Sequence, residues 1–136
     1  MTPEPGSCPF CTLPGARIER QSDLALALFD AYPVSEGHAL VIPKTPARNV
    51  LDATPEQLAA CLVTVQRVAR AQLNAFGAHG ITIQQFNEPA GGQVVFHLHY
   101  HVIPRWDGVR LGAHTGEMEK NEVLAAAADK LRKALE

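Results

Sequence analysis

Residues 92–105 read GQVVFHLHYHVIPR, and this stretch decides both the fold and the site. Three histidines, His97, His99 and His101, alternate in it with larger apolar side chains. Because successive side chains of a strand point to opposite faces, the alternation predicts a strand from Val94 or Val95 to Ile103. One face of this strand would carry the three imidazoles, and the other would pack on a hydrophobic core.

Imidazoles in this pattern suit chemistry at phosphorus. Same-face residues of a strand lie about 6.5 to 7 Å apart, so one phosphate group can contact two of them. An imidazole whose other nitrogen is held protonated can act as a nucleophile, and a second one can protonate the leaving group. The preceding turn at residues 89–93 contains Gly91 and Gly92, whose backbone N–H groups can approach phosphate oxygens without obstruction. The residues alone therefore point to a phosphate site.

Working outward, four further strands and two helices are predicted. We expect a hairpin over residues 17–20 and 23–30, a strand at 38–42 that ends at Pro43, and a strand at 80–86. Pro104 would close the histidine strand. The fold class is then α+β, with a five-stranded antiparallel sheet, a long helix and a C-terminal helix over residues 117–135. We expect His38, in the third strand, to be a hydrogen-bonded structural residue.

The long helix carries the clearest boundary signals. Thr54 can cap it, Pro55 suits the first helical position, Gln57 completes a capping box, and Gly77 follows its end. The apolar residues at helical spacing that we expect to face the sheet are Leu58, Leu62, Val65, Val68 or Ala69, Leu73 and Phe76.

The composition is that of an ordinary globular protein. A chain of 136 residues suits one hydrophobic core, so we expect a single domain over residues 1–136. The net charge of −2 provides no basic stripe to neutralise a polynucleotide, which argues against a nucleic acid polymer as partner. Without a leader pattern or a long apolar run, the expected location is the cytoplasm, with no membrane contact.

The histidine stretch resembles the signature of the histidine triad (HIT) family. Residues 26–30, 37–44 and 81–87 resemble the same family, so the likeness covers residues 8 to about 105 and leaves 106–136 as a C-terminal extension. The resemblance implies a five-stranded antiparallel sheet with two helices, commonly in a homodimer. It also implies action at the α-phosphate of purine nucleotides.

The resemblance further implies roles for single residues. His99 would be the nucleophile that takes the nucleotidyl group, His101 would bind the phosphate and assist the leaving group, and His97 would support the orientation of the site. The expected substrate contacts are Asp30 at the ribose, Asn87, Gly92, Gln93 and Val94 at the phosphate, and Phe10 and Leu13 at the base.

Two departures from the family pattern concern metal and hydroxyl chemistry. The resemblance implies a zinc site made of Cys8, Cys11, His97 and a further histidine, whose position is Pro46 here. Structural zinc normally has four protein ligands, so this site is incomplete, and two free cysteines are the favoured alternative. The resemblance also implies that a Ser or Thr is often present at position 94, where this chain has Val94, so only a backbone N–H remains. The chemistry itself requires no cofactor.

We therefore expect a hydrolase or nucleotidyl transferase acting on a purine nucleoside phosphoramidate or dinucleoside polyphosphate, through a nucleotidyl adduct on His99. The alternative is a nucleotide-binding module with little or no turnover, because Val94 and Pro46 remove polar support. A third interpretation makes the three histidines a metal site, but no acidic ligand set or His-x-x-x-His pattern accompanies them. The expected partners are a purine nucleotide and a second copy of the chain.

Overall fold

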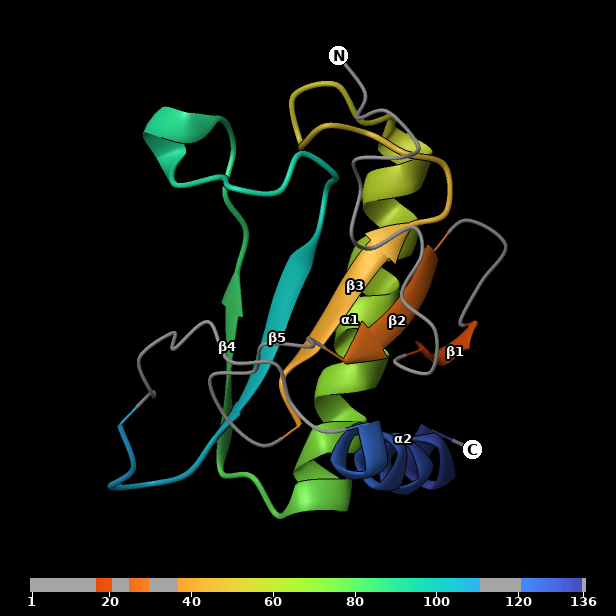
Figure 1. Ribbon diagram of the computed structural model, residues 1–136, viewed down its shortest axis with the longest axis vertical. Helices are drawn as coiled ribbons and strands as arrows, with labels where there is room; N and C mark the ends of the chain where they lie inside the picture. The colour runs from red at the N-terminus through yellow and green to blue at the C-terminus, as the bar shows by residue number, and fades with distance from the viewer. Residues whose placement is uncertain (1–16, 21–24, 30–36, 111–120, 136) are drawn as a thin grey trace.

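The computed structural model describes residues 17–20, 25–29, 37–110 and 121–135. In chain order its elements are β1 (Arg17–Arg20), β2 (Ala25–Phe29), β3 (Ala39–Pro43), α1 (Pro55–Phe76), β4 (Gly80–Gln84), a 3₁₀ turn (Pro89–Gly91), β5 (Tyr100–Arg105) and α2 (Asn121–Leu135). The strands form one antiparallel sheet in the order β1-β2-β3-β5-β4. Helix α1 packs along one face of the sheet, against β2, β3 and β5, and α2 packs on α1 (Figure 1). The predicted α+β class is confirmed.

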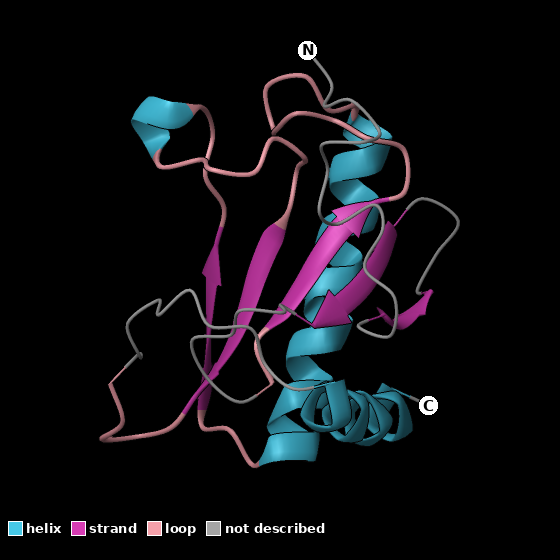
Figure 2. Cartoon of the chain, viewed as in Figure 1, coloured by secondary structure: helices cyan, strands magenta, loops and turns pink. Residues whose placement is uncertain are grey.

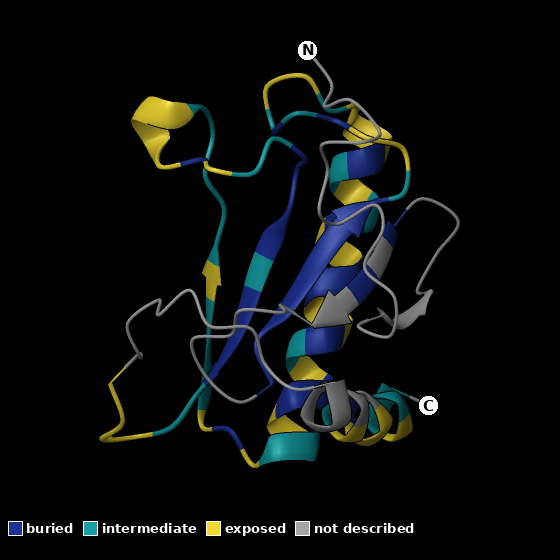
Figure 3. Ribbon diagram, viewed as in Figure 1, coloured by how far each residue is buried: buried dark blue, intermediate teal, exposed yellow. Residues whose placement is uncertain are grey.

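Strand β3 is buried along its whole length, in the middle of the sheet (Figure 3). Ala39 and Val41 belong to the core cluster that α1 covers, together with Tyr100 and Val102 of β5. Residues directly opposite each other in an antiparallel pair share a face, so His101 and its partner in register, Leu40, lie on the other face. The sequence alternation of β5 therefore separates the core from the site, as predicted.

Helix α1 begins and ends where its capping signals predict. Gln57 N donates to Thr54 Oγ1 over 3.1 Å, Thr54 N donates to Gln57 Oε1 over 2.9 Å, and Gly77 ends the helix in the left-handed conformation with φ 62°. The predicted apolar face is partly wrong, because Leu62 and Leu73 are exposed. The buried face consists instead of Gln57, Cys61, Thr64, Val65, Val68, Ala71 and Gln72.

Gln72 explains this shift of the buried face. Its Nε2 donates to the backbone oxygens of Gly37 and Val102, 2.9 Å away in each case, where β3 and β5 stop pairing. These two hydrogen bonds turn a polar residue toward the sheet. Sequence periodicity of apolar residues alone does not detect such a contact.

Strand β5 differs from the predicted histidine strand at both ends. It begins at Tyr100, so His101 is in the strand but His97 and His99 precede it. It also continues through Pro104 to Arg105. The oxygen of Arg105 accepts from His79 N on the β4 side, so the nitrogen of Pro104 faces the other side, where the pairing with β3 has already ended at Val102. Pro104 therefore leaves no bond of the ladder unmade.

Two loops gather at the end of the sheet where β3 finishes and β5 starts (Figure 2). One connects β3 to α1 over residues 44–54, and the other connects β4 to β5 over residues 85–99. The loop between β4 and β5 carries His97 and His99, whereas His101 lies in β5 itself. Within the described residues, none of the helices has the length and apolar character needed to cross a membrane.

Candidate active site

The histidine segment is a loop held by the neighbouring loop rather than by a strand. Its ladder pairing starts only at Tyr100, whereas Leu98 N donates to Ala47 O over 2.7 Å. The Leu98 side chain is fully buried in the core cluster. This one residue thus fixes the segment on two sides, through its backbone to the β3–α1 loop and through its side chain to the core.

His99 is oriented by its own chain. Its Nδ1 lies 2.7 Å from His97 O, and because a carbonyl oxygen can only accept, Nδ1 carries the proton. In the neutral ring the lone pair therefore resides on Nε2. The His99 side chain is buried, with 9% of the residue exposed. An imidazole in this tautomer presents a nucleophilic Nε2.

Burial also keeps the two buried triad histidines neutral. It lowers the pKa of His99, against the hydrogen bond to His97 O that raises it, and the nearby His97 lowers it further. Burial likewise lowers the pKa of His97, whose Nε2 lies 3.2 Å from Pro43 O. An unprotonated His99 is the form that can attack an electrophile.

His101 is surrounded by three rings. Its Nδ1 lies 2.9 Å from His38 Nε2, and its ring centroid lies 5.0 Å from that of His99 and 6.1 Å from that of Phe86. In the pair with His38, one nitrogen donates and the other accepts, so His38 influences which nitrogen of His101 carries a proton. The prediction that His38 is hydrogen-bonded is confirmed, and its partner is a member of the triad.

The three histidines do not form one row on a strand. His99 and His101 lie in edge-to-face contact, whereas His97 turns to Pro43 and supports His99 through its carbonyl group. The arrangement brings one neutral imidazole next to a second that can exchange a proton. Nucleophilic displacement with an assisted leaving group requires these two groups, a nucleophile and a proton donor.

Two of the residues expected at the phosphate are engaged with the chain itself. Asn87 and Gln85 exchange amide hydrogen bonds of 2.8 and 2.9 Å, and Asn87 Oδ1 also accepts from Val50 N. Gln93 is 4% exposed and makes four side-chain hydrogen bonds, two as acceptor and two as donor. These amides hold the loops in place.

The other two expected phosphate contacts lie at the turn. Gly92 has φ 96°, its N–H donates to Pro89 O, and a Cβ there would lie 3.2 Å from the Phe86 ring. A glycine is therefore required at this position. Val94 is 83% exposed, so an apolar side chain stands at the surface just before the histidine segment.

Five predicted residues, Asp30, Phe10, Leu13, Cys8 and Cys11, lie outside the described residues. Of the positions implied for zinc, Pro46 has no side-chain donor atom, and the Nε2 of His97 faces the Pro43 oxygen. Within the part of the chain that the structure describes, no group of three or more His, Cys, Asp or Glu side chains is arranged to hold a metal ion. These described positions do not fit a four-ligand zinc site, and no chemical step below uses a metal.

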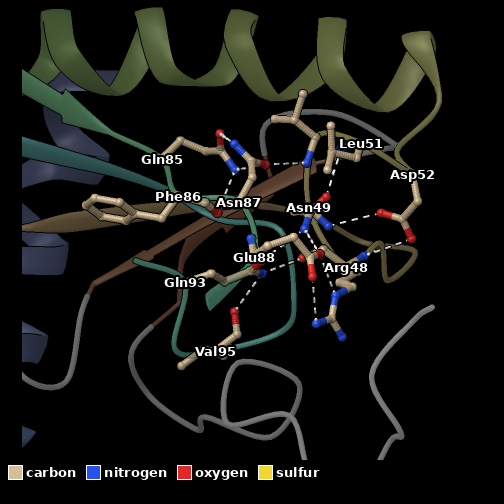
Figure 4. A network of polar contacts seen from close by, with 11 residues as sticks. Arg48, Asn49, Leu51, Asp52, Gln85, Phe86, Asn87, Glu88, Gln93 and Val95 are labelled. Carbon is tan, nitrogen blue, oxygen red and sulfur yellow. Dashed lines mark hydrogen bonds and ion pairs between the residues drawn. The ribbon is translucent and has the colours of Figure 1, made fainter. Parts of the chain in front are cut away.

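A polar network that sequence reasoning missed joins the two loops (Figure 4). Its centre is Glu88, whose carboxylate accepts from the side chains of Arg48 and Asn49. The four side-chain hydrogen bonds of Gln93 complete it. These residues lie about 40 positions apart in the chain, and no local pattern in the sequence connects them.

Comparison with known proteins supports the fold. The HIT domain model matches residues 16–108. Adenosine 5'-monophosphoramidase hnt1 of Schizosaccharomyces pombe is 35% identical over 103 residues, 73% of this chain and 74% of the relative. Adenylylsulfatase HINT3 of Arabidopsis thaliana is 32% identical over 106 residues, 74% of this chain and 54% of the relative. A zinc-bound histidine triad family protein of Mycobacterium smegmatis is 33% identical, with a TM-score of 0.83 over 97% of this chain and 95% of that one.

Proposed function

This chain belongs to the histidine triad (HIT) domain family, and from that premise we propose that it is a hydrolase of nucleoside phosphate derivatives. We propose further that it acts at the α-phosphate of a purine nucleoside phosphoramidate or dinucleoside polyphosphate, with His99 as the nucleophile. Two relatives named for hydrolysis of adenylyl compounds, the phosphoramidase and the adenylylsulfatase, support the substrate class.

The observation that carries the proposal is the hydrogen bond from His99 Nδ1 to His97 O. It leaves the lone pair on Nε2, and burial keeps that nitrogen unprotonated at neutral pH. In the first step Nε2 attacks the α-phosphorus and the bond to the leaving nitrogen or oxygen breaks. The leaving atom takes a proton from His101, whose position between His38 and His99 suits it to donate.

In the second step water attacks the phosphorus of the nucleotidyl adduct. The electron pair of the N–P bond returns to Nε2 of His99, and His101 accepts the proton of the attacking water. The products are a nucleoside monophosphate and a regenerated His99. Two easier displacements replace one difficult displacement.

A single-turnover experiment tests this mechanism. The protein is incubated in excess over adenosine phosphoramidate, and released AMP is quantified for the wild type and for His99→Ala. We expect release by the wild type only, with a transient protein mass increase equal to an adenylyl group. Equal release by both proteins would show the mechanism to be wrong.

A nucleotide-binding module with little turnover is the second candidate. The exposed Val94 favours it, since this position lacks a hydroxyl that could bond the phosphate or the leaving group. Binding of AMP by the wild type, without product after long incubation with the phosphoramidate, would support this candidate over the hydrolase.

We propose that two copies of the chain form a homodimer. Strand β4 lies at an edge of the sheet, with Ile83 half exposed, and α1 exposes Leu62, Val63 and Leu73. Unpaired strand edges and exposed apolar side chains favour association. Sedimentation equilibrium should give twice the mass of the 136-residue chain, and a monomer at all concentrations would refute the proposal.

A further inference from the structure

Glu88 has a backbone conformation that only glycine adopts without strain. Its φ is 66° and its ψ is 160°, and among the described residues no other non-glycine has a positive φ. Strained backbone persists where the surrounding structure holds it in place, and it is concentrated at functional sites. A glycine would be the unstrained choice here, so the presence of a glutamate points to a task for the carboxylate.

That carboxylate is held by two side chains of the β3–α1 loop (Figure 4). Arg48 donates to it from Nε over 2.7 Å and from Nη2 over 3.1 Å, and Asn49 Nδ2 donates over 2.6 Å. The side chains of Arg48 and Glu88 are 24% and 43% exposed. Exposed ion pairs contribute little to stability, so the Arg48–Glu88 pair alone does not account for the strain.

The backbone of Glu88 is bound from the other side by the turn that precedes the histidines. Its N–H donates to Gln93 Oε1 over 2.8 Å, and its oxygen accepts from Gly91 N and Gln93 N. Gln93 Nε2 then donates to Arg48 O over 2.7 Å and to Val95 O over 3.1 Å. Glu88 and Gln93 therefore form one unit with the β3–α1 loop.

This unit fixes the residues on either side of His97. Val95 is bound by Gln93, and the Phe96 ring lies under the Arg48 guanidinium, with 4.3 Å between the ring centroid and Cζ. Leu98 N is bound by Ala47, next to Arg48 in the chain. The His97 oxygen that orients His99 thus sits in a segment whose position depends on the contacts of Glu88.

We infer that Glu88 is a positioning residue for the reaction: through Arg48 and Gln93 it sets the place of the loop that holds His99. The inference rests on the proposed hydrolysis at His99. Loss of the carboxylate should lower kcat, because a displacement of about 1 Å in a reacting group can reduce the rate about a hundred-fold. The KM should change little, because Glu88 itself contacts no reacting atom.

Glu88→Gly and Glu88→Ala together separate the carboxylate from the strain. Glycine removes both, whereas alanine removes the carboxylate and keeps the strain. We expect Glu88→Gly to have the higher Tm of the two, and both variants to lose at least about ten-fold in kcat, with KM for adenosine phosphoramidate within about two-fold of the wild-type value. Glu88→Gln, which keeps the length and an acceptor oxygen, should recover part of the loss. Asp129→Ala is the control, since it breaks the exposed Asp129–Arg132 pair of α2 far along the chain.

A second measurement reads the positioning without turnover. Imidazole signals of His97 and His99 are recorded by NMR for the wild type, Glu88→Gly and Asp129→Ala. We expect them to shift in Glu88→Gly and to stay unchanged in the control. A wild type that releases no AMP would refute the proposed hydrolysis, and shifted signals would then still support the positioning role. Unchanged imidazole signals, or wild-type kcat in Glu88→Gly, would overturn the inference.

Discussion

The two ends of β5 both bring a histidine next to polar groups, with opposite results. At the carboxyl end, His79 Nδ1 accepts from Asp107 N over 2.9 Å and lies 3.5 Å from Asp107 Oδ2, and these side chains are 55% and 94% exposed. At the amino end, His99 is buried and is bonded to a backbone oxygen. A carboxylate near an exposed imidazole yields a solvated surface pair. Burial together with a neutral acceptor yields a neutral ring with a defined tautomer.

Alanine substitution of His99 at one end and of His79 at the other tests this contrast most strongly. His99→Ala should lower kcat for adenosine phosphoramidate by at least about a thousand-fold, because it removes the nucleophile itself. His79→Ala should leave kcat within about two-fold. Both variants are compared by steady-state AMP release, with folding checked by circular dichroism. Comparable losses of kcat in the two variants would show that the buried and the exposed histidine do not differ in their role.

Local features of this fold could be predicted from the sequence. Each end of α1 is set by residues within a single turn. The capping box of Thr54 and Gln57 starts the helix and Gly77 ends it, both where expected. Alternation correctly placed Tyr100 and Val102 in the core. Alternation also predicted that the strand starts at Val94 or Val95, which is wrong. The sequence pattern does not show that Leu98 N donates to Ala47 O rather than to a strand partner.

The site depends on contacts between distant positions, which explains what the sequence did not reveal. His38 and His101 are 63 residues apart, and Arg48 and Glu88 are 40 apart. The triad itself was predicted because its members are close together in the chain. Neither the histidine just before β3 nor the glutamate in a Pro/Gly turn carries a sequence signal of its own. Their roles emerge only from the pairing of β3 with β5 and from the contacts between the two loops.

A core substitution under the histidine segment sharpens the contrast between this buried loop and the exposed edge of the sheet. Leu98 lies between His97 and His99 in the sequence, and its side chain is fully buried in the core. Leu98→Ala should therefore lower the free energy of unfolding by about 2 to 5 kcal/mol. Ile83 of the edge strand β4 is 51% exposed, and Ile83→Ala should cost less, about 1 kcal/mol. Urea denaturation measures both. If the two costs were equal, the segment would not depend on the core for its position.

The His38 contact makes a smaller, more specific prediction. His38→Ala removes the partner of His101 Nδ1 and should lower kcat on the order of ten-fold to a hundred-fold, because His101 then lacks a group that fixes its proton. His38→Gln places an amide nitrogen near the position of Nε2 and should recover part of this activity. A loss of stability without any change in kcat would leave His38 with a purely structural role. Recovery by Gln is the readout that a packing effect would not produce, provided that the Tm values of the two variants agree.

The acid limb of the pH profile gives the most graded test of the amino end. Protonation consumes the lone pair on His99 Nε2, and burial holds the pKa of His99 below the ordinary 6.5 of a solvated imidazole. The value of kcat/KM should therefore stay level as the pH falls through 6.5 and then decrease about ten-fold per pH unit below the lowered pKa.

The same two lowered pKa values affect stability. The unfolded chain binds protons more readily at His99 and His97, so folding stability should also be lost as the pH falls below 6.5. His79→Gln should give the same profile as the wild type. A midpoint at or above 6.5 would mean that burial does not lower the pKa of His99.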